Sequence, residues 1–298
     1  MCGIVGLFLK NKTLEPQLGA LLSGMLGTMG DRGPDSAGFA VYGTPHEGRT
    51  KITVQSAEPE TAFAGLTDSI RQSIGGEVDL ARKSSHAVLT VPTEDADRVR
   101  DAIRSRHPDI RIMASGETIE IYKEVGYPTE VSRRFDLAHM AGSHGIGHTR
   151  MATESAVTTL GAHPFSTGFD QCLVHNGSLS NHNNIRRELK HDGVEFATDN
   201  DTEVAAAYLS WRIKQGLNLG EALEEGLNDL DGFYTFVVGT KDGFGVLRDP
   251  IACKPAVLAE TDQYVAFGTE YRALVGLPGI EDARVWEPEP ATVYFWER

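Results

Sequence analysis

The chain has 298 residues, 40% of them apolar and 23% charged, enough for one large domain or two ordinary ones with a substantial core. The 28 basic and 42 acidic residues give a formal net charge of -14, which argues against nucleic acid or an anionic membrane as the main partner. No apolar stretch approaches the roughly 20 residues of a membrane span. Three cysteines without a paired spacing, and an N-terminus unlike a signal peptide, favour a reducing, cytoplasmic compartment.

The N-terminal residues predict a strand followed by a helix. Residues 3–9 form an apolar run interrupted by glycine, which is typical of a buried strand. Leucines and methionines then recur at spacings of three and four over residues 14–29, which predicts one buried face of a helix that ends at Gly30. The segment DRGPDSAG combines turn residues with the start of a second strand, so Arg32 is expected at a loop-to-strand junction.

Residues from 51 to about 140 differ in pattern from the rest of the chain. HAVLTV predicts a strand, and the segment after it predicts a helix with Val99 and Ile103 on one face. IRIMASGETIEIYKEV then predicts a β-hairpin. We interpret this part as a small inserted α/β module.

Strands and helices resume after the insertion. GIGHTRMAT and QCLVHNGSLS predict strands, and NNIRRELKHDG a helix. TDNDTEVAAAYLSWRIKQG predicts a second helix, opened by an Asn or Asp N-cap with Glu203 in its first turn. LGEALEEGLNDL predicts a third helix, and four strands follow. Strands at both ends with helices between them predict an α+β fold of two packed sheets covered by helices.

Cys2 carries the most informative chemistry. Removal of Met1 would leave a thiol and an α-amine on one residue, and this amine, with a pKa of roughly 7.7 to 8.0, could act as the general base for the thiol. A cysteine at position 2 could equally well only begin a strand. The position alone therefore does not identify a nucleophile.

The motifs that accompany Cys2 decide between these interpretations. MCGIVG, DRGPDSAG, GHTRMAT, HPF, LVHNGSLSNHNNIRREL and TDNDTEV occur in this order, followed by LDGFYTFVV, LRDPIACKPAVLAE and FGTEYRAL. Together they resemble the class II, N-terminal-nucleophile glutamine amidotransferases over nearly the whole chain except the insertion. The resemblance implies an N-terminal-nucleophile hydrolase αββα sandwich of two mainly antiparallel sheets between helices. It also implies one domain over residues 1–298 that contains the insertion at about 51–140.

The resemblance implies that Cys2 attacks the side-chain amide of glutamine and releases ammonia and glutamate through a γ-glutamyl thioester. The Asn176 side chain and the Gly177 backbone N–H would donate to the oxyanion, although an Asn-Gly pair alone also fits a tight turn. Arg150 would bind the substrate carboxylate with its planar fork. Asp201 would bind the substrate ammonium, although alone it also fits a helix N-cap.

Three further residues complete the expected site. Thr153 and the backbone around Met151 would line the substrate pocket, and Arg32 would support the wall around the nucleophile. Residue 151 departs from the family pattern, because many relatives carry an aromatic residue after the arginine.

We expect the following histidines and cysteines to have structural roles. His144 and His148 lie in a predicted strand, which does not place both on one helical face for a metal. We expect His163 and His175 to be pocket or core residues, and Cys172 and Cys253 to be buried thiols.

Ammonia from a lone glutaminase would be lost to water, so the family couples it to a second active site. The sequence ends at VYFWER directly after the amidotransferase motifs, so we expect the second site on another polypeptide. With its long insertion, the chain resembles the separately encoded amidotransferase chain of glutamate-synthase-like complexes, of the type found in N-methylglutamate synthase. This implies two partners, a subunit with a glycine-rich repeat and a flavin-binding subunit that would hold FMN, and no cofactor or metal in this chain.

Two alternatives remain open at this point. One is a subunit that binds glutamine or glutamate without hydrolysing it, and the other is a self-standing amidohydrolase of the same fold. The insertion could dock the synthase subunit, bind an effector or only enlarge the fold.

Overall fold

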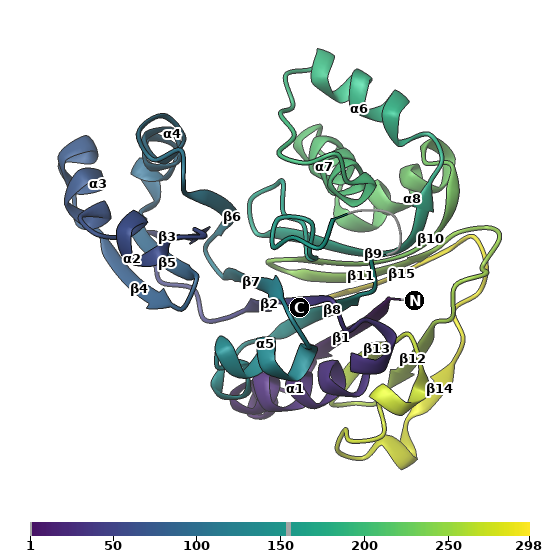
Figure 1. Cartoon of the computed structure of the whole chain (residues 1–298). Helices are drawn as coiled ribbons and strands as arrows, with labels where there is room; N and C mark the ends of the chain where they lie inside the picture. Colours follow the sequence, from purple (N-terminus) through teal and green to yellow (C-terminus); the bar gives the residue numbers. More distant parts are fainter. Residues whose placement is uncertain (1, 153–155) are drawn as a thin grey trace.

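Two stacked β-sheets lie between two layers of helices in the computed structural model, which describes residues 2–152 and 156–298 (Figure 1). The larger sheet has the order β14 (Arg284–Trp286), β12 (Val257–Glu260), β13 (Tyr264–Gly268), β1 (Gly3–Leu9), β8 (His144–Arg150), β2 (Ser36–Tyr42), β7 (Ile119–Val125). The second has the order β15 (Thr292–Glu297), β11 (Gly243–Arg248), β10 (Gly232–Thr240), β9 (Gln171–Leu179). All ladders in both sheets are antiparallel. The expected sandwich is confirmed.

Helices cover the outer face of each sheet (Figure 1). On the larger sheet these are α1 (Leu18–Thr28) and α5 (Pro128–Arg134), and on the second sheet α6 (His182–His191), α7 (Asp201–Lys214) and α8 (Leu219–Asp229). Short 3-10 helices span Lys12–Gln17, Gly30–Arg32, Thr93–Asp95, Leu137–His139, Tyr271–Ala273 and Ile280–Asp282. No helix in the described ranges is long and apolar enough to cross a membrane.

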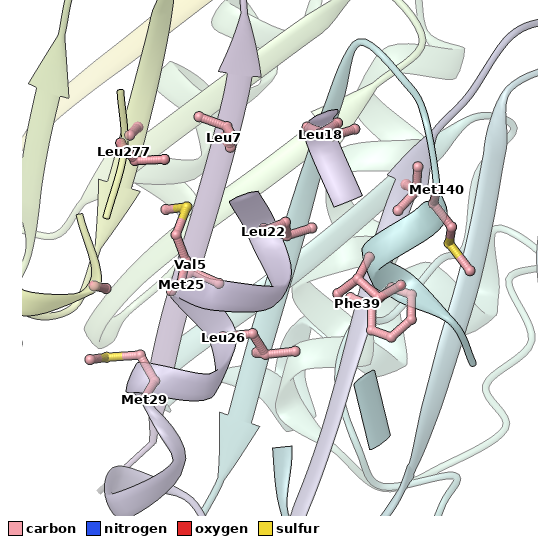
Figure 2. Packing of buried hydrophobic residues seen from close by; sticks show 14 of the residues in the cluster. Val5, Leu7, Leu18, Leu22, Met25, Leu26, Met29, Phe39, Met140 and Leu277 are labelled. Carbon is pink, nitrogen blue, oxygen red and sulfur yellow. The ribbon is translucent and has the colours of Figure 1, made fainter. Parts of the chain in front are cut away.

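Strand β1 lies in the middle of the larger sheet and is buried on both faces. Val5 and Leu7 pack in one cluster with α1, whose Met25 lies over the strand (Figure 2). Ile4 belongs to the separate core between the two sheets. This burial explains why β1 is apolar at almost every position. Because β13 and β8 pair with β1 on either side, the sheet fixes the strand that begins next to Cys2.

A third, four-stranded sheet forms the body of the insertion, set apart from the sandwich (Figure 1). Its order is β4 (Asp79–Lys83), β5 (His86–Pro92), β3 (Arg49–Gln55), β6 (Arg111–Gly116), with the helices α2 (Pro59–Ala62), α3 (Leu66–Ile74) and α4 (Ala96–Arg106). The prediction of a hairpin over residues 110–125 is wrong. Strand β6 pairs with β3, whereas β7 pairs with β2 in the larger sheet.

The small sheet therefore spans residues 49–116. Residues 117–140, which the sequence analysis placed in the insertion, contribute β7 and α5 to the sandwich, where α5 packs against α1. The reason is that the turn between β6 and β7 carries the chain from one sheet to the other instead of folding the strands onto each other.

Candidate active site

Cys2 is half-buried and lies at the start of β1, where residues from distant parts of the chain meet. Its carbonyl oxygen accepts a hydrogen bond from Arg32 Nε at 3.0 Å and one from Asn176 Nδ2 at 3.3 Å. Its Sγ lies 3.9 Å from the carbonyl oxygen of Met151. The fold thus brings together four of the residues singled out in the sequence and holds the backbone of Cys2 from two sides.

Arg32 reaches Cys2 from the end of the 3-10 helix Gly30–Arg32. Its guanidinium also forms an ion pair with Glu270, which Arg272 Nε contacts at 2.6 Å. Partial burial would raise the pKa of Glu270, but the hydrogen bonds and positive charges of the two arginines outweigh this and hold the pKa below its ordinary value. Glu270 therefore carries a negative charge that anchors Arg32 beside Cys2.

Asn176 and Gly177 lie near the end of β9, which pairs with β10. Gly177 has φ of +135°, and a Cβ at this position would lie 1.9 Å from the Phe233 carbonyl oxygen, so only glycine fits. The Asn-Gly pair therefore forms part of a strand and not a two-residue turn. Since the Cys2 carbonyl can only accept, the amide group of Asn176 is oriented with its NH2 toward Cys2. An oxyanion donor needs this orientation.

Asp201 is the first residue of α7, and Asn200 is the N-cap, since its side chain accepts a hydrogen bond from Thr202 N at 2.8 Å. The carboxylate of Asp201 accepts a hydrogen bond from Leu179 N at 3.0 Å. Its position at a helix N-terminus stabilises the negative charge. With 23% of its side chain exposed, Asp201 is free to meet a cation from solvent.

Three buried histidines pack behind these residues. The rings of His148 and His163 stack with centroids 4.0 Å apart, and His148 Nε2 donates to the carbonyl oxygen of His175 at 3.2 Å. Thr202 Oγ1 lies 2.7 Å from His163 Nε2 and 3.1 Å from His175 Nδ1. The expectation of pocket or core histidines is confirmed for His163 and His175, and His148 joins them.

Burial keeps these three rings neutral. It lowers the pKa of His148 to about 3 and that of His163 well below its ordinary value. The pKa of His175 is also lowered by burial, although the Asp201 carboxylate, 3.7 Å from Nδ1, opposes the shift. The wall behind Asp201 therefore adds no positive charge that would compete for its carboxylate.

Arg150 ends strand β8 directly before Met151. It is 7% exposed, and its Nη1 donates to the carbonyl oxygen of Ala156 at 3.4 Å, so the side chain lies against the loop that follows. Asp35 ties this corner together, because its N–H donates to the Arg150 carbonyl and its carboxylate accepts from Ala152 N at 2.8 Å. Met151 is 46% exposed, and Thr153 lies outside the described residues.

Cys253 is exposed, so the expectation of a buried thiol is wrong, whereas Cys172 is fully buried as expected. The physical reason is the buried Arg248. Its Nη2 donates to the carbonyl oxygens of Ala252 at 2.9 Å and Lys254 at 3.2 Å, which occupies the inner side of this loop and leaves the thiol outside.

Thr269 and Glu270 were not identified from the sequence, although both touch residues around Cys2. The motif FGTEYRAL gave the only available signal, and it indicates a strand end without assigning a role. The described part of the chain holds no cluster of three or more His, Cys, Asp or Glu side chains suited to a metal ion.

Comparison with known proteins adds independent evidence. A family model described as a glutamine amidotransferase domain matches residues 148–276. The "Glutamine amidotransferase-like protein GlxB" of Rhizobium meliloti (strain 1021) is 66% identical over 297 residues, which cover all of this chain and 98% of the relative. A protein of Methanothermobacter thermautotrophicus, also named for glutamine amidotransferase, is 32% identical over 308 residues and 99% of each chain.

The fold has solved counterparts. Glutamine phosphoribosylpyrophosphate amidotransferase from B. subtilis superimposes with a TM-score of 0.63 at 19% identity, over 99% of this chain and 47% of that one. This chain therefore spans about half the length of the solved structure, and the likeness concerns the fold alone.

Proposed function

Because the chain belongs to the class II glutamine amidotransferase family, we propose that it hydrolyses the side-chain amide of glutamine with Cys2 as the nucleophile. The observation that carries the proposal is the meeting of Arg32 and Asn176 on the carbonyl oxygen of Cys2. This contact fixes the nucleophilic residue and turns an amide NH2 toward it. A cysteine that only began a strand would need neither.

The reaction begins once Met1 has been removed from Cys2. The thiol passes its proton to the α-amine of the same residue, and the sulfur attacks the carboxamide carbon. The negative charge on the carboxamide oxygen is stabilised by the Asn176 side chain and the Gly177 N–H, each contributing about 3 kcal/mol. The C–N bond then breaks, the proton moves from the amine to the departing nitrogen, and ammonia leaves. Water attacks the γ-glutamyl thioester, which releases glutamate and restores the thiol.

In this proposal one positively charged and one negatively charged side chain bind the two charged groups of glutamine. Arg150 binds the α-carboxylate and Asp201 the α-ammonium of glutamine, while Thr153 and Met151 line the pocket. This assignment is supported by the position of Arg150 next to Met151, whose carbonyl oxygen lies 3.9 Å from Cys2 Sγ. It is also supported by the partly exposed carboxylate of Asp201 at the start of α7.

The test is covalent labelling with a diazo-ketone norleucine, a reactive glutamine analogue, followed by intact mass and N-terminal peptide analysis. We expect loss of Met1 and one adduct, on Cys2. Cys253→Ala is the matched control, because it removes an exposed thiol and should leave the adduct unchanged. Cys2→Ala should abolish the adduct. A chain that keeps Met1 and takes no adduct would contradict the proposal and favour a subunit that binds glutamine or glutamate without hydrolysis.

We further propose that the ammonia is used in a multi-subunit glutamate-synthase-like enzyme of the N-methylglutamate synthase type. The partners would be a subunit with a glycine-rich repeat and a flavin-binding subunit that carries FMN. Support comes from the end-to-end match to GlxB, a separate chain of similar length, while the solved relative is about twice as long. Adding the synthase subunits should raise glutaminase activity and lower the free ammonia per glutamate formed. Full activity of the chain alone, with no response to the subunits, would indicate a self-standing amidohydrolase instead.

A further inference from the structure

Thr269 directly follows strand β13 and makes a contact that the proposed chemistry does not yet use. Its side chain is buried, with 1% of the residue exposed. The Oγ1 atom accepts a hydrogen bond from Ile4 N at 2.8 Å and one from Asn176 Nδ2 at 3.3 Å. Its own N–H donates to the Ile4 carbonyl at 2.9 Å. Thr269 thus connects the strand of the nucleophile with the side chain that faces it.

These contacts determine how the Asn176 amide is turned. Its two N–H groups have two acceptors, the Cys2 carbonyl oxygen and Thr269 Oγ1. If the amide were flipped, its oxygen would face the Cys2 carbonyl oxygen, and two acceptors would repel each other. Asn176 Oδ1 is buried and makes no hydrogen bond of ordinary geometry among the residues that the structure describes, although the ring of His148 interacts with this amide. The Cys2 carbonyl, which can only accept, therefore sets which way the amide is turned, whereas the Thr269 hydroxyl, which can donate or accept, fixes where the amide lies.

Of these acceptors, Thr269 is the one whose position is independent of the nucleophile. The bond from Ile4 N fixes its oxygen, and Ile4 itself is held in the ladder between β1 and β8. The Cys2 carbonyl, in contrast, belongs to the residue whose thiol reacts. A fixed second acceptor holds the amide in place while Nδ2 exchanges one long bond for a bond to the substrate oxygen.

We propose that Thr269 is a positioning residue that holds the Asn176 side-chain amide in place beside Cys2 before substrate binds; the inference rests on the proposed function for its effect on catalysis. Thr269 acts through Asn176 and touches no reacting atom. A purely structural role is the competing explanation, because its hydroxyl also accepts from a buried backbone N–H of β1. The two explanations differ in what happens to the Asn176 side chain.

The test compares Thr269→Val, which removes the hydroxyl, with Thr269→Ser, which keeps it. Thr235→Val is the matched control, because Thr235 is equally buried, lies opposite Asn176 in β10, and its hydroxyl has no partner in the described ranges. The first measurement is NMR of the full chain labelled with 15N-asparagine, with the side-chain signal of Asn176 assigned by its loss in Asn176→Ala. It requires no catalytic activity. The second measurement is kcat and KM for glutamine.

We expect Thr269→Val to broaden or shift the Asn176 side-chain signal and to lower kcat about tenfold with little change in KM, because an oxyanion donor acts in the transition state. Thr269→Ser should restore both, and Thr235→Val should change neither. In an Asn176→Ala background, Thr269→Val should lower kcat no further. If Thr269→Val does not fold, Thr269→Cys takes its place, because sulfur is a weaker acceptor of similar size.

Three results would overturn the inference. An unchanged Asn176 signal in Thr269→Val would show that the amide does not depend on the hydroxyl. An equal loss of kcat in Thr235→Val, or a further loss in the Asn176→Ala background, would indicate a general packing effect. A wild-type chain without glutaminase activity would refute the proposed function, and the NMR comparison alone would then decide on Thr269.

Discussion

Buried histidines make the stability of this protein sensitive to mild acid. Burial lowers the pKa of His86, His144 and His148 to about 3, compared with about 6.5 for an exposed histidine. Between these values the unfolded chain binds protons that the folded chain does not. The contribution of these neutral histidines to the free energy of unfolding is therefore fully present above pH 6.5 and is lost as the pH falls toward 3.

The size of the effect follows from the proton count. Between pH 6 and pH 5 each of these histidines binds on average about 0.9 proton in the unfolded chain and almost none in the folded chain, which costs about 1.2 kcal/mol. The three together cost about 3.6 kcal/mol, a large part of a typical stability of about 5–15 kcal/mol. His163 and His175 are shifted in the same direction and add to the loss. Carboxyl groups with ordinary pKa values near 4 contribute little in this window.

Urea unfolding followed by tryptophan fluorescence at pH 6.5, 6.0, 5.5 and 5.0 measures this loss. His144 suits a variant because it lies away from the candidate site, stacked on Tyr42 at 3.9 Å. His144→Gln should reduce the loss between pH 6 and pH 5 by about 1.2 kcal/mol. His191→Gln is the control, since 92% of that side chain is exposed, and it should leave the pH dependence unchanged. A wild-type loss below about 1 kcal/mol over this window would refute the reasoning.

Three further predictions concern single side chains. Gly177→Ala places a methyl group 1.9 Å from the Phe233 carbonyl oxygen at φ of +135°, so we expect a loss of at least about 3 kcal/mol in urea unfolding, and a loss under about 1 kcal/mol would contradict the backbone geometry. Arg32→Met removes a donor to Cys2 and the cation beside Glu270. We expect the pKa of Glu270, measured by 13C NMR, to rise and covalent labelling of Cys2 to slow. An unchanged pKa of Glu270 would argue against the ion pair. Leu22→Ala empties a fully buried position on α1 and should cost about 3 to 5 kcal/mol, whereas unaltered unfolding would mean that the core closes around the gap.

Periodicity predicted those parts of the fold in which local pattern and burial agree. The apolar run of β1 packs in two cores, one of which it shares with the leucine and methionine face of α1, so the patterns that burial imposes are visible in the sequence. The segment 111–125 shows the limit of such patterns. Two strands joined by a turn look the same whether they pair with each other or enter different sheets, and pairing with β3 and β2 depends on residues far away in the chain.

The candidate site also contains residues that the sequence could indicate and residues that it could not. Cys2, Asn176 and Gly177 could be proposed because their chemistry is specific and their motifs occur in order. Thr269 could not, since a threonine after a strand is common and its contacts come from residues 4 and 176. The sequence context of Cys253 predicts a buried thiol, but the residue is exposed because the buried Arg248 side chain binds the backbone carbonyls on either side of it, which decides which side of the loop faces inward.

The position of β1 in its sheet also determines when the surroundings of Cys2 can form during synthesis. One neighbour, β8, is completed at residue 150, and the other, β13, consists of Tyr264–Gly268 near the end of the chain. While the ribosome makes the intervening residues, one edge of the first strand has no partner. Contacts that span so much of the chain also slow folding. Cys2 therefore gains its fixed surroundings only after almost the whole chain has been made.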